Sequence, residues 1–257
     1  MTTLTFTRDT QFSLPGGLTR IQCWGAGGYG NQTGAGGSGG AYSEIITSLS
    51  AGTYRANVGK SLLVNEDGAS ILRSVGHVIY CRAAGGRIDG SISHQAGLAV
   101  GDTASLGGEG GVDDAGYSSY NGAGGGGAGG PNGNGESGKN GTNGKLINER
   151  KLSSFYYRND EAPSGGSSNG GGGRGGDGAY YEASIGPASI LFAQAGEFPG
   201  GGGGGSYDYG TNPVGSGAGG LVLVSYDVVV TPTPTATPTP TATPTPTETP
   251  TPTPTGT

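Results

Sequence analysis

Residues 25–30, Gly-Ala-Gly-Gly-Tyr-Gly, fit the GxGxxG pattern with which dinucleotide-binding proteins hold a pyrophosphate. That chemistry needs a strand before the glycines and a helix N-terminus after them, whose N–H groups face the phosphates. A strand is expected before Gly25, and Glu44 lies at the distance of a ribose-binding acid. Residues 31–37, Asn-Gln-Thr-Gly-Ala-Gly-Gly, cannot begin a stable helix. We therefore expect a chance match in a chain with 60 glycines, and no dinucleotide cofactor.

Residues 133–140, Gly-Asn-Gly-Glu-Ser-Gly-Lys-Asn, come close to a phosphate-binding P-loop. Asn140 stands where a Ser or Thr hydroxyl should reach a bound Mg²⁺. No strand is expected before this segment and no helix after it. A flexible turn is the better interpretation.

His77 and His94 are the only histidines, and no Cys or carboxylate has metal-ligand spacing with either. We expect His77 on a strand and His94 in a loop, without the base and nucleophile that acyl transfer requires. Asp102, Asp113 and Asp114 could supply some oxygens to a Ca²⁺ ion, but such residues are more often solvated turn residues. The sequence thus predicts no catalytic residues, no cofactor and no metal site, and a protein that is not an enzyme.

Tyrosines in or beside glycine-rich stretches are the one positive sign of a binding site. A tyrosine gives rigid contact area and a hydroxyl, and glycine and serine give adaptable loops, as in antibody paratopes. A saccharide or an outer-membrane loop could stack on these rings. The alternative is that the rings cover the glycine-rich part in place of a core, which we favour for Tyr180 and Tyr181. The candidate receptor-contact residues are Tyr117, Tyr120, Tyr156, Tyr157, Tyr207 and Tyr209.

Glycines concentrate in runs between short strand-like segments, at 25–40, 107–135, 165–178 and 200–220. The runs lack the strict three-residue period of collagen, which excludes a triple helix. Because glycine loses the most backbone entropy on folding, such runs are either disordered or held by dense backbone hydrogen bonding. In the ordered case we expect polyglycine-II-like segments packed side by side.

The composition narrows the function classes. Hydrophobic residues make up 32% of the 257 residues and charged residues 12%, and the net charge is −6. No basic cluster could neutralise phosphates, so nucleic-acid binding is not expected. No apolar stretch approaches the length of a membrane span. Since the first residues do not resemble a signal peptide, a protein working outside a cell would need another exit, such as a virion released by lysis.

Short alternating segments separated by glycine turns predict an all-β sandwich. We expect a hairpin between residues 4–8 and 18–24, turning at residues 14–17, and a loop or one helical turn over 146–157. Further strands are expected at residues 41–49, 53–58, 69–73, 77–83, 190–195 and 221–230.

Cys23 and Cys81 each lie in an expected strand. A disulfide between them is possible if those strands are neighbours. We favour two small buried hydrophobic residues, because a single bridge does not make a disulfide framework.

From Thr231 to the end, Thr and Pro alternate. Proline fixes φ and pushes the residue before it to extended angles, which predicts a polyproline-II rod about 80 Å long. It is either a passive spacer or a stalk with O-linked sugars on its threonines. The expected domains are a glycine-rich β domain at 1–230, with an insert at about 85–178, and a Thr/Pro-rich stalk or linker at 231–257.

Both ends of the body, roughly residues 1–84 and 186–230, carry a further pattern. Phe6 is followed by the turn Leu14-Pro15-Gly16-Gly17, and a strand ends in Trp24-Gly25-Ala26-Gly27-Gly28. Then come Gly39-Gly40-Ala41-Tyr42, Gly52-Thr53-Tyr54 with Val58-Gly59, and Gly217-Ala218-Gly219-Gly220 before an apolar strand. This pattern resembles the glycine-rich domain of bacteriophage tail and virion proteins and of some bacterial surface proteins. Cys23 departs from it, since that family usually has an aliphatic residue there, and the insert at 85–178 exceeds its simple form.

The resemblance implies a structural protein without catalysis, and some phage adhesins of this kind bind receptors through tip loops on polyglycine sandwiches. We therefore expect a virion protein, either a tail-fibre or a decoration adhesin. Its partners would be other copies of itself or other virion proteins, with a host cell-surface glycan or membrane protein as receptor. The alternative is a self-assembling subunit of an extracellular or cell-surface filament or sheath.

Overall fold

In the computed structural model, regular secondary structure consists of strands alone within the described part of the chain, which confirms the all-β prediction. The structure describes residues 1–61, 68–88, 99–112, 123–139, 145–147, 156–158, 164, 166–167, 172–177, 180–182, 189–206 and 213–227. Within these ranges there is no helix with the length and hydropathy to cross a bilayer. The predicted rod at 231–257 lies outside them, as do Asp113 and Asp114, for which solvated turn residues were the favoured interpretation.

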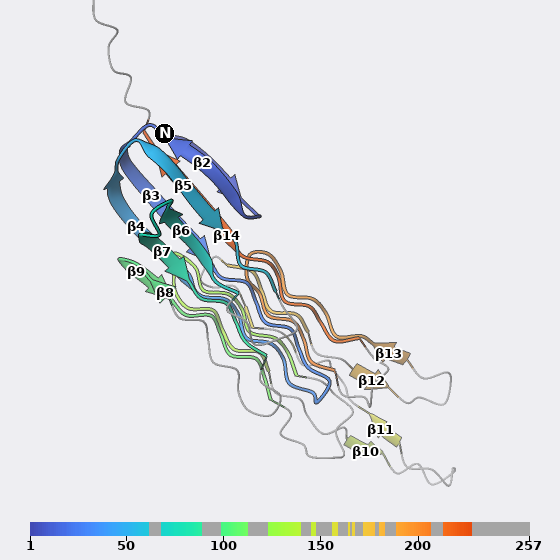
Figure 1. Cartoon of the computed structure of the whole chain (residues 1–257). Coiled ribbons are helices and arrows are strands. Elements are labelled where there is room, and N and C mark those ends of the chain that lie inside the picture. The colour runs from blue at the N-terminus through green and yellow to red at the C-terminus, as the bar shows by residue number, and fades with distance from the viewer. Residues whose placement is uncertain are drawn as a thin grey trace, which may run out of the picture.

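Two antiparallel sheets of five strands each lie at one end of the molecule (Figure 1). Sheet A has the order β1-β14-β3-β4-β9: β1 (Thr2–Phe6), β14 (Leu221–Tyr226), β3 (Gly17–Trp24), β4 (Tyr42–Leu49) and β9 (Thr103–Ser105). Sheet B has the order β2-β5-β6-β7-β8: β2 (Thr10–Leu14), β5 (Gly52–Asn57), β6 (Ser70–Ser74), β7 (Ile79–Ala83) and β8 (Ala99–Val100).

The two sheets share one hydrophobic core, because alternate residues of their strands are apolar. In β3, Ile21 and Cys23 are buried while Arg20 and Gln22 point to the other face. Sheet A contributes Phe6, Ile21, Cys23, Leu49, Val222 and Val224, and sheet B contributes Leu14, Tyr54, Ala56, Leu72, Cys81 and Ala83. This core is small, and it is confined to the strand end of the molecule.

The predicted hairpin between residues 4–8 and 18–24 is wrong. β1 and β3 do not pair with each other, because β14 lies between them and pairs with both. The chain between them forms β2, which pairs with β5 in the other sheet. The alternation of Phe12 and Leu14 with polar residues was the signal for this missed strand. The predicted strand at 77–83 begins only at Ile79, since His77 lies in the preceding turn with φ 68°.

Cys23 and Cys81 are free thiols, each with 0% exposure. They come from β3 and β7 and therefore belong to different sheets. The favoured prediction of two buried hydrophobic residues is confirmed. Burial raises the pKa of the Cys23 thiol, which keeps it neutral in the core.

At the inner end of the sheets the strands continue into glycine-rich segments that run alongside one another (Figure 1). We call them the glycine layer, which comprises residues 25–30, 35–41, 84–87, 106–112, 123–130, 135–139, 172–177, 194–206 and 215–220. Hydrogen bonds between backbone groups of different segments hold the layer together. The N-terminus lies at the opposite end of the sheets (Figure 1).

In an inner segment of the layer, successive N–H groups donate to three different neighbouring segments in turn. The N–H groups of residues 123–129 donate to residues 34–40 (from Ala123, Gly126 and Gly129), 136–139 (from Gly124 and Gly127) and 173–176 (from Gly125 and Ala128). Residues 36–41 do the same toward 108–111, 200–203 and 84–87. An extended helix with three residues per turn and no internal hydrogen bonds gives this rotation.

Close packing of backbone against backbone explains why the inner segments need glycine. A Cβ on Gly126 would lie 2.0 Å from the carbonyl oxygen of Gly108, and one on Gly202 would lie 2.1 Å from that of Gly37. Side chains return at every third residue on an outer segment, where Leu106 and Glu109 are exposed. The positions that carry side chains thus mark the boundary of the layer.

We predict that Gly126→Ala destabilises the protein by about 3 kcal/mol or more, since a methyl group there would overlap fixed backbone. Gly52→Ala is the matched control, because a Cβ at Gly52 meets nothing within 4 Å. It should change the free energy of unfolding by less than about 0.5 kcal/mol. Urea unfolding followed by the fluorescence of the single tryptophan, Trp24, measures both. Equal effects of the two substitutions would contradict a backbone-packed layer.

Candidate functional site

Two short hairpin pairs lie at the end of the glycine layer away from the five-stranded sheets (Figure 1). β10 (Lys145–Ile147) pairs with β11 (Tyr156–Arg158), and β12 (Tyr180–Glu182) pairs with β13 (Ser189–Leu191). β11 also contacts β12. The prediction of a loop or helical turn over 146–157 is therefore wrong at both its ends, where the chain forms paired strands.

The structure places four of the tyrosines on these far strands. Tyr156 and Tyr157 stand opposite Ile147 and Leu146 in the β10–β11 register. Tyr180 and Tyr181 occupy the first two positions of β12. Since β11 contacts β12, the far end gathers tyrosines from two hairpins. The other candidates, Tyr117, Tyr120, Tyr207 and Tyr209, lie outside the described residues.

The GxGxxG segment at 25–30 is part of the glycine layer, and the N–H groups of its four glycines are already bonded. Gly25 and Gly28 donate to Ala41 and Ser38, at 2.9 Å each. Gly27 and Gly30 donate to Ala218 and Gly215, at 2.8 and 3.0 Å. A pyrophosphate would have to compete with these carbonyl groups for the same donors. These glycines serve the packing of the layer.

The P-loop-like segment also contributes its backbone to the layer. The N–H groups of Gly135 and Gly138 donate to the carbonyls of Leu106 and Glu109. Those of Glu136 and Lys139 donate to residues 167 and 164. A phosphate cradle needs several free N–H groups turned toward one point, whereas these point to different neighbouring segments.

No cluster of His, Cys, Asp or Glu with metal-binding geometry occurs among the residues that the structure describes. His77 lies in the turn between β6 and β7, where its Nδ1 is 3.1 Å from Nη1 of Arg73. His94 lies outside the described residues.

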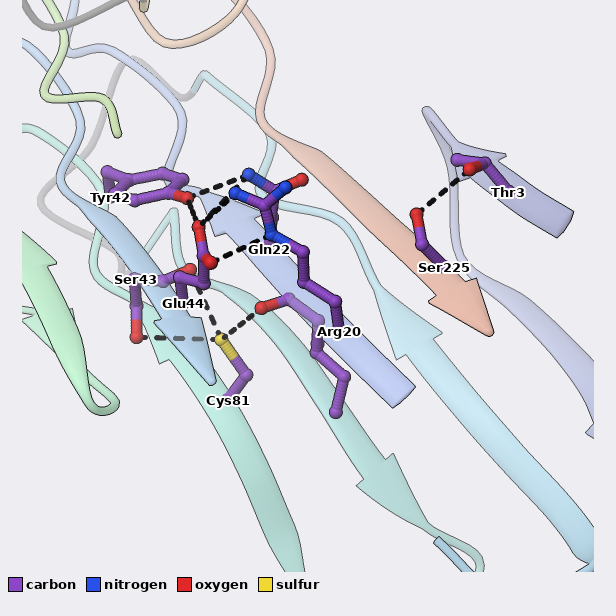
Figure 2. A network of polar contacts seen from close by, with 9 residues as sticks. Thr3, Arg20, Gln22, Tyr42, Ser43, Glu44, Cys81 and Ser225 are labelled. Atoms are coloured by element: carbon purple, nitrogen blue, oxygen red, sulfur yellow. Dashed lines mark hydrogen bonds and ion pairs between the residues drawn. The ribbon is translucent and has the colours of Figure 1, made fainter. Parts of the chain in front are cut away.

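A polar network on the outer face of sheet A is a feature that sequence reasoning missed (Figure 2). Arg20 donates two parallel hydrogen bonds to Glu44, from Nε to Oε1 at 2.8 Å and from Nη2 to Oε2 at 2.9 Å. Gln22 donates to the Tyr42 hydroxyl at 2.8 Å and to Glu44 at 3.2 Å. The Tyr42 hydroxyl in turn donates to Glu44. The signal was polar residues at alternate positions of two neighbouring strands, with Gln22 directly opposite Glu44 in the register.

The network fixes the charge of each member. The bonds from Arg20 hold the pKa of Glu44 below its usual range. Burial, with the negative charge of Glu44, raises the pKa of Tyr42, so that the phenol keeps its proton. Glu44 is only 12% exposed and all its partners are donors. The charge-assisted hydrogen bonds to the ionised carboxylate therefore join β3 to β4.

We predict that Glu44→Gln costs about 1–3 kcal/mol at pH 7, because a charge-assisted fork is lost. A carboxylate with a depressed folded-state pKa stabilises the fold above its unfolded pKa, near 4.3, and loses that contribution as the pH falls through the folded value. The difference between variant and wild type should therefore shrink toward pH 3 in urea unfolding. Glu109→Gln, at an exposed site, is the control. An effect of Glu44→Gln that stays constant from pH 7 to pH 3 would contradict the ion pair.

Comparison of the chain with protein-family models and with curated proteins finds no match in either case. The function must therefore be argued from the fold and from the position of the candidate residues.

Proposed function

We propose that this chain is a non-enzymatic virion structural protein, a tail-fibre or decoration adhesin that contacts the host surface. The single observation that carries the proposal is that the two ends of the molecule differ. The N-terminus and Asp227, the last described residue, lie at one end of the molecule, tyrosine-bearing hairpins lie at the other, and the glycine layer joins them (Figure 1). The receptor would be a host cell-surface glycan or membrane protein.

Support for an attachment end comes from the chain termini. The N-terminal amine lies 3.4 Å from Asp227, the residue with which the described C-terminal part ends. The described part of the chain therefore begins and ends at the strand end of the molecule, and residues 231–257 lie outside the described ranges. In the proposal they form a polyproline-II stalk that spaces the protein from other copies of itself or from other virion proteins.

Support for a rigid body comes from the hydrogen bonds of the layer. We infer a β-sandwich that continues into polyglycine-II-like segments, because the rotation of donors over three neighbours fits that helix. Bonds between segments far apart in sequence leave each segment little freedom. A rigid support lowers the entropy lost when loops at its far end bind a receptor.

The alternative is a self-assembling subunit of an extracellular filament or sheath. The edge strand β1 favours it, since one side of β1 pairs with β14 and β1 ends the order of sheet A. An open strand edge can pair with another chain.

Binding of the fluorescently labelled full-length chain to a panel of intact bacterial cells tests the proposal. We expect saturable binding to a subset of strains, competed by surface polysaccharide extracted from those strains. The double variant Tyr156→Ser/Tyr157→Ser should weaken binding about tenfold or more, the loss typical of aromatic contact residues.

The control is Leu18→Ser/Ile46→Ser, which removes two exposed apolar side chains from sheet A, at the other end of the molecule. It should bind as the wild type does. Polymerisation that grows with concentration, without binding to any cell, would favour the filament instead.

A further inference from the structure

Two thiols meet in the hydrophobic core, and the proposed function uses neither of them. Cys23 lies on β3 of sheet A and Cys81 on β7 of sheet B, and both are free and fully buried. An aliphatic side chain would fill either position as well. What sets these residues apart from the rest of the core is therefore the chemistry of sulfur.

The sulfur of Cys81 reaches across to sheet A. Its Sγ lies 3.4 Å from the carbonyl oxygen of Ser43, 3.5 Å from the Ser43 hydroxyl and 4.0 Å from the carbonyl oxygen of Ile21 (Figure 2). Ser43 stands directly opposite Cys23 in the β3–β4 register, and Ile21 shares the buried face of β3 with Cys23. The Cys81 sulfur is therefore beside Cys23, and the two thiols are hydrogen-bonded to each other.

The backbones of β3 and β7 also come together where the two strands lead into the glycine layer. The strands contact each other. Just beyond them, a Cβ on Gly25 would lie 2.0 Å from the carbonyl oxygen of Ala84, and the Gly86 N–H donates to the Ala26 carbonyl at 2.7 Å. A disulfide needs adjacent sulfur atoms on closely spaced backbones, and this place in the fold supplies both.

We propose that Cys23 and Cys81 form an oxidation site, at which a small-molecule disulfide converts the thiol pair into a covalent cross-link between the two sheets. The Cys81 sulfur attacks one sulfur of the reagent, which forms a mixed disulfide and releases the first half of the reagent. The Cys23 sulfur then attacks the Cys81 sulfur, which forms the bond between the cysteines and releases the second half. The two cysteines lose two electrons and two protons, and the reagent gains them as two thiols.

Cys81 is the first nucleophile, because its surroundings favour the thiolate, which is the reactive form. Hydrogen bonds from Cys23 and Ser43 lower the pKa of the Cys81 thiol, although burial opposes them. Burial raises the pKa of the Cys23 thiol, which keeps its proton and can donate it to the neighbouring sulfur.

Burial controls when the pair reacts, since the reagent reaches the sulfur atoms only when the core opens. The bond then ties β3, the middle strand of sheet A, to sheet B. It closes a loop from residue 23 to residue 81, which restricts the unfolded chain. Because the sulfur atoms already adjoin in the reduced protein, the native packing needs little change.

The inference rests on the core alone, and it holds whether or not the far hairpins bind a host cell. The surroundings of the protein decide the state of the pair. The thiols persist in a reducing cytoplasm, and the cross-link forms in an oxidising environment.

Incubation of the full-length chain with glutathione disulfide, in urea just below the unfolding midpoint, tests the site. A maleimide then labels the free thiols after denaturation, and mass spectrometry counts them. The wild type should carry a label on both cysteines before oxidation and on neither afterwards, with a mass lower by that of two hydrogen atoms. Its unfolding temperature, measured without reagent, should rise by about 5 °C or more. Without urea the same reaction should be at least about tenfold slower.

Cys23→Ala and Cys81→Ala are the matched controls, since each keeps one thiol in the same core. Neither should gain thermal stability from the oxidant. The thiol count of the wild type needs no variant, so it decides the question even where a substitution unfolds the core. A wild type that keeps both labels, or that carries glutathione without the cross-link, would overturn the proposal. So would an oxidised form that unfolds at or below the temperature of the reduced one.

Discussion

The glycine-rich part of this molecule, and the far hairpins that it carries, depend on one constraint, that a buried backbone amide must find a partner. In the glycine layer, that partner is the carbonyl group of another segment, at 2.7–3.0 Å in most pairs. Two backbones approach so closely only where neither carries a Cβ toward the other, as at Gly126 and Gly202. Glycine therefore has the role here that apolar side chains have in an ordinary core. The layer is stabilised by many directional bonds and by little hydrophobic burial.

The hydrophobic core has a different task. It fixes the two sheets at one end, and the spacing and order of their strands set the starting positions of the glycine segments. β3, β4 and β14 lead directly into or out of the layer at Trp24, Tyr42 and Leu221, whose side chains form a small second cluster. The Trp24 and Tyr42 rings lie 4.8 Å apart at this junction, and the bond between Arg20 and Glu44 holds the same two strands further along. An apolar core thus fixes the strands at one end, and backbone hydrogen bonds hold the segments that continue from them.

In the proposed function, the glycine layer is the spacer and the far hairpins are the contact end. Each segment between the sheets and the far hairpins is joined to several neighbouring segments by backbone hydrogen bonds. The far hairpins can differ in sequence without disturbing the layer, because the layer needs only glycine and small residues at its inner positions.

The sequence by itself determined the class of the fold, since the alternation in residues 17–24 and 221–226 and the glycine turns admit strands but no helices. It also favoured two buried hydrophobic residues at Cys23 and Cys81 over a disulfide, and it placed the tyrosines near glycine-rich stretches. Only the tertiary structure decided which strands pair. β14 comes from the end of the chain and separates β1 from β3, and a local turn signal cannot report a partner so distant. The sequence also did not show that successive N–H groups of one segment donate to three neighbours in turn. A glycine has no side chain whose pattern could reveal the direction of its N–H. The fork from Arg20 to Glu44 exists only once the register is set.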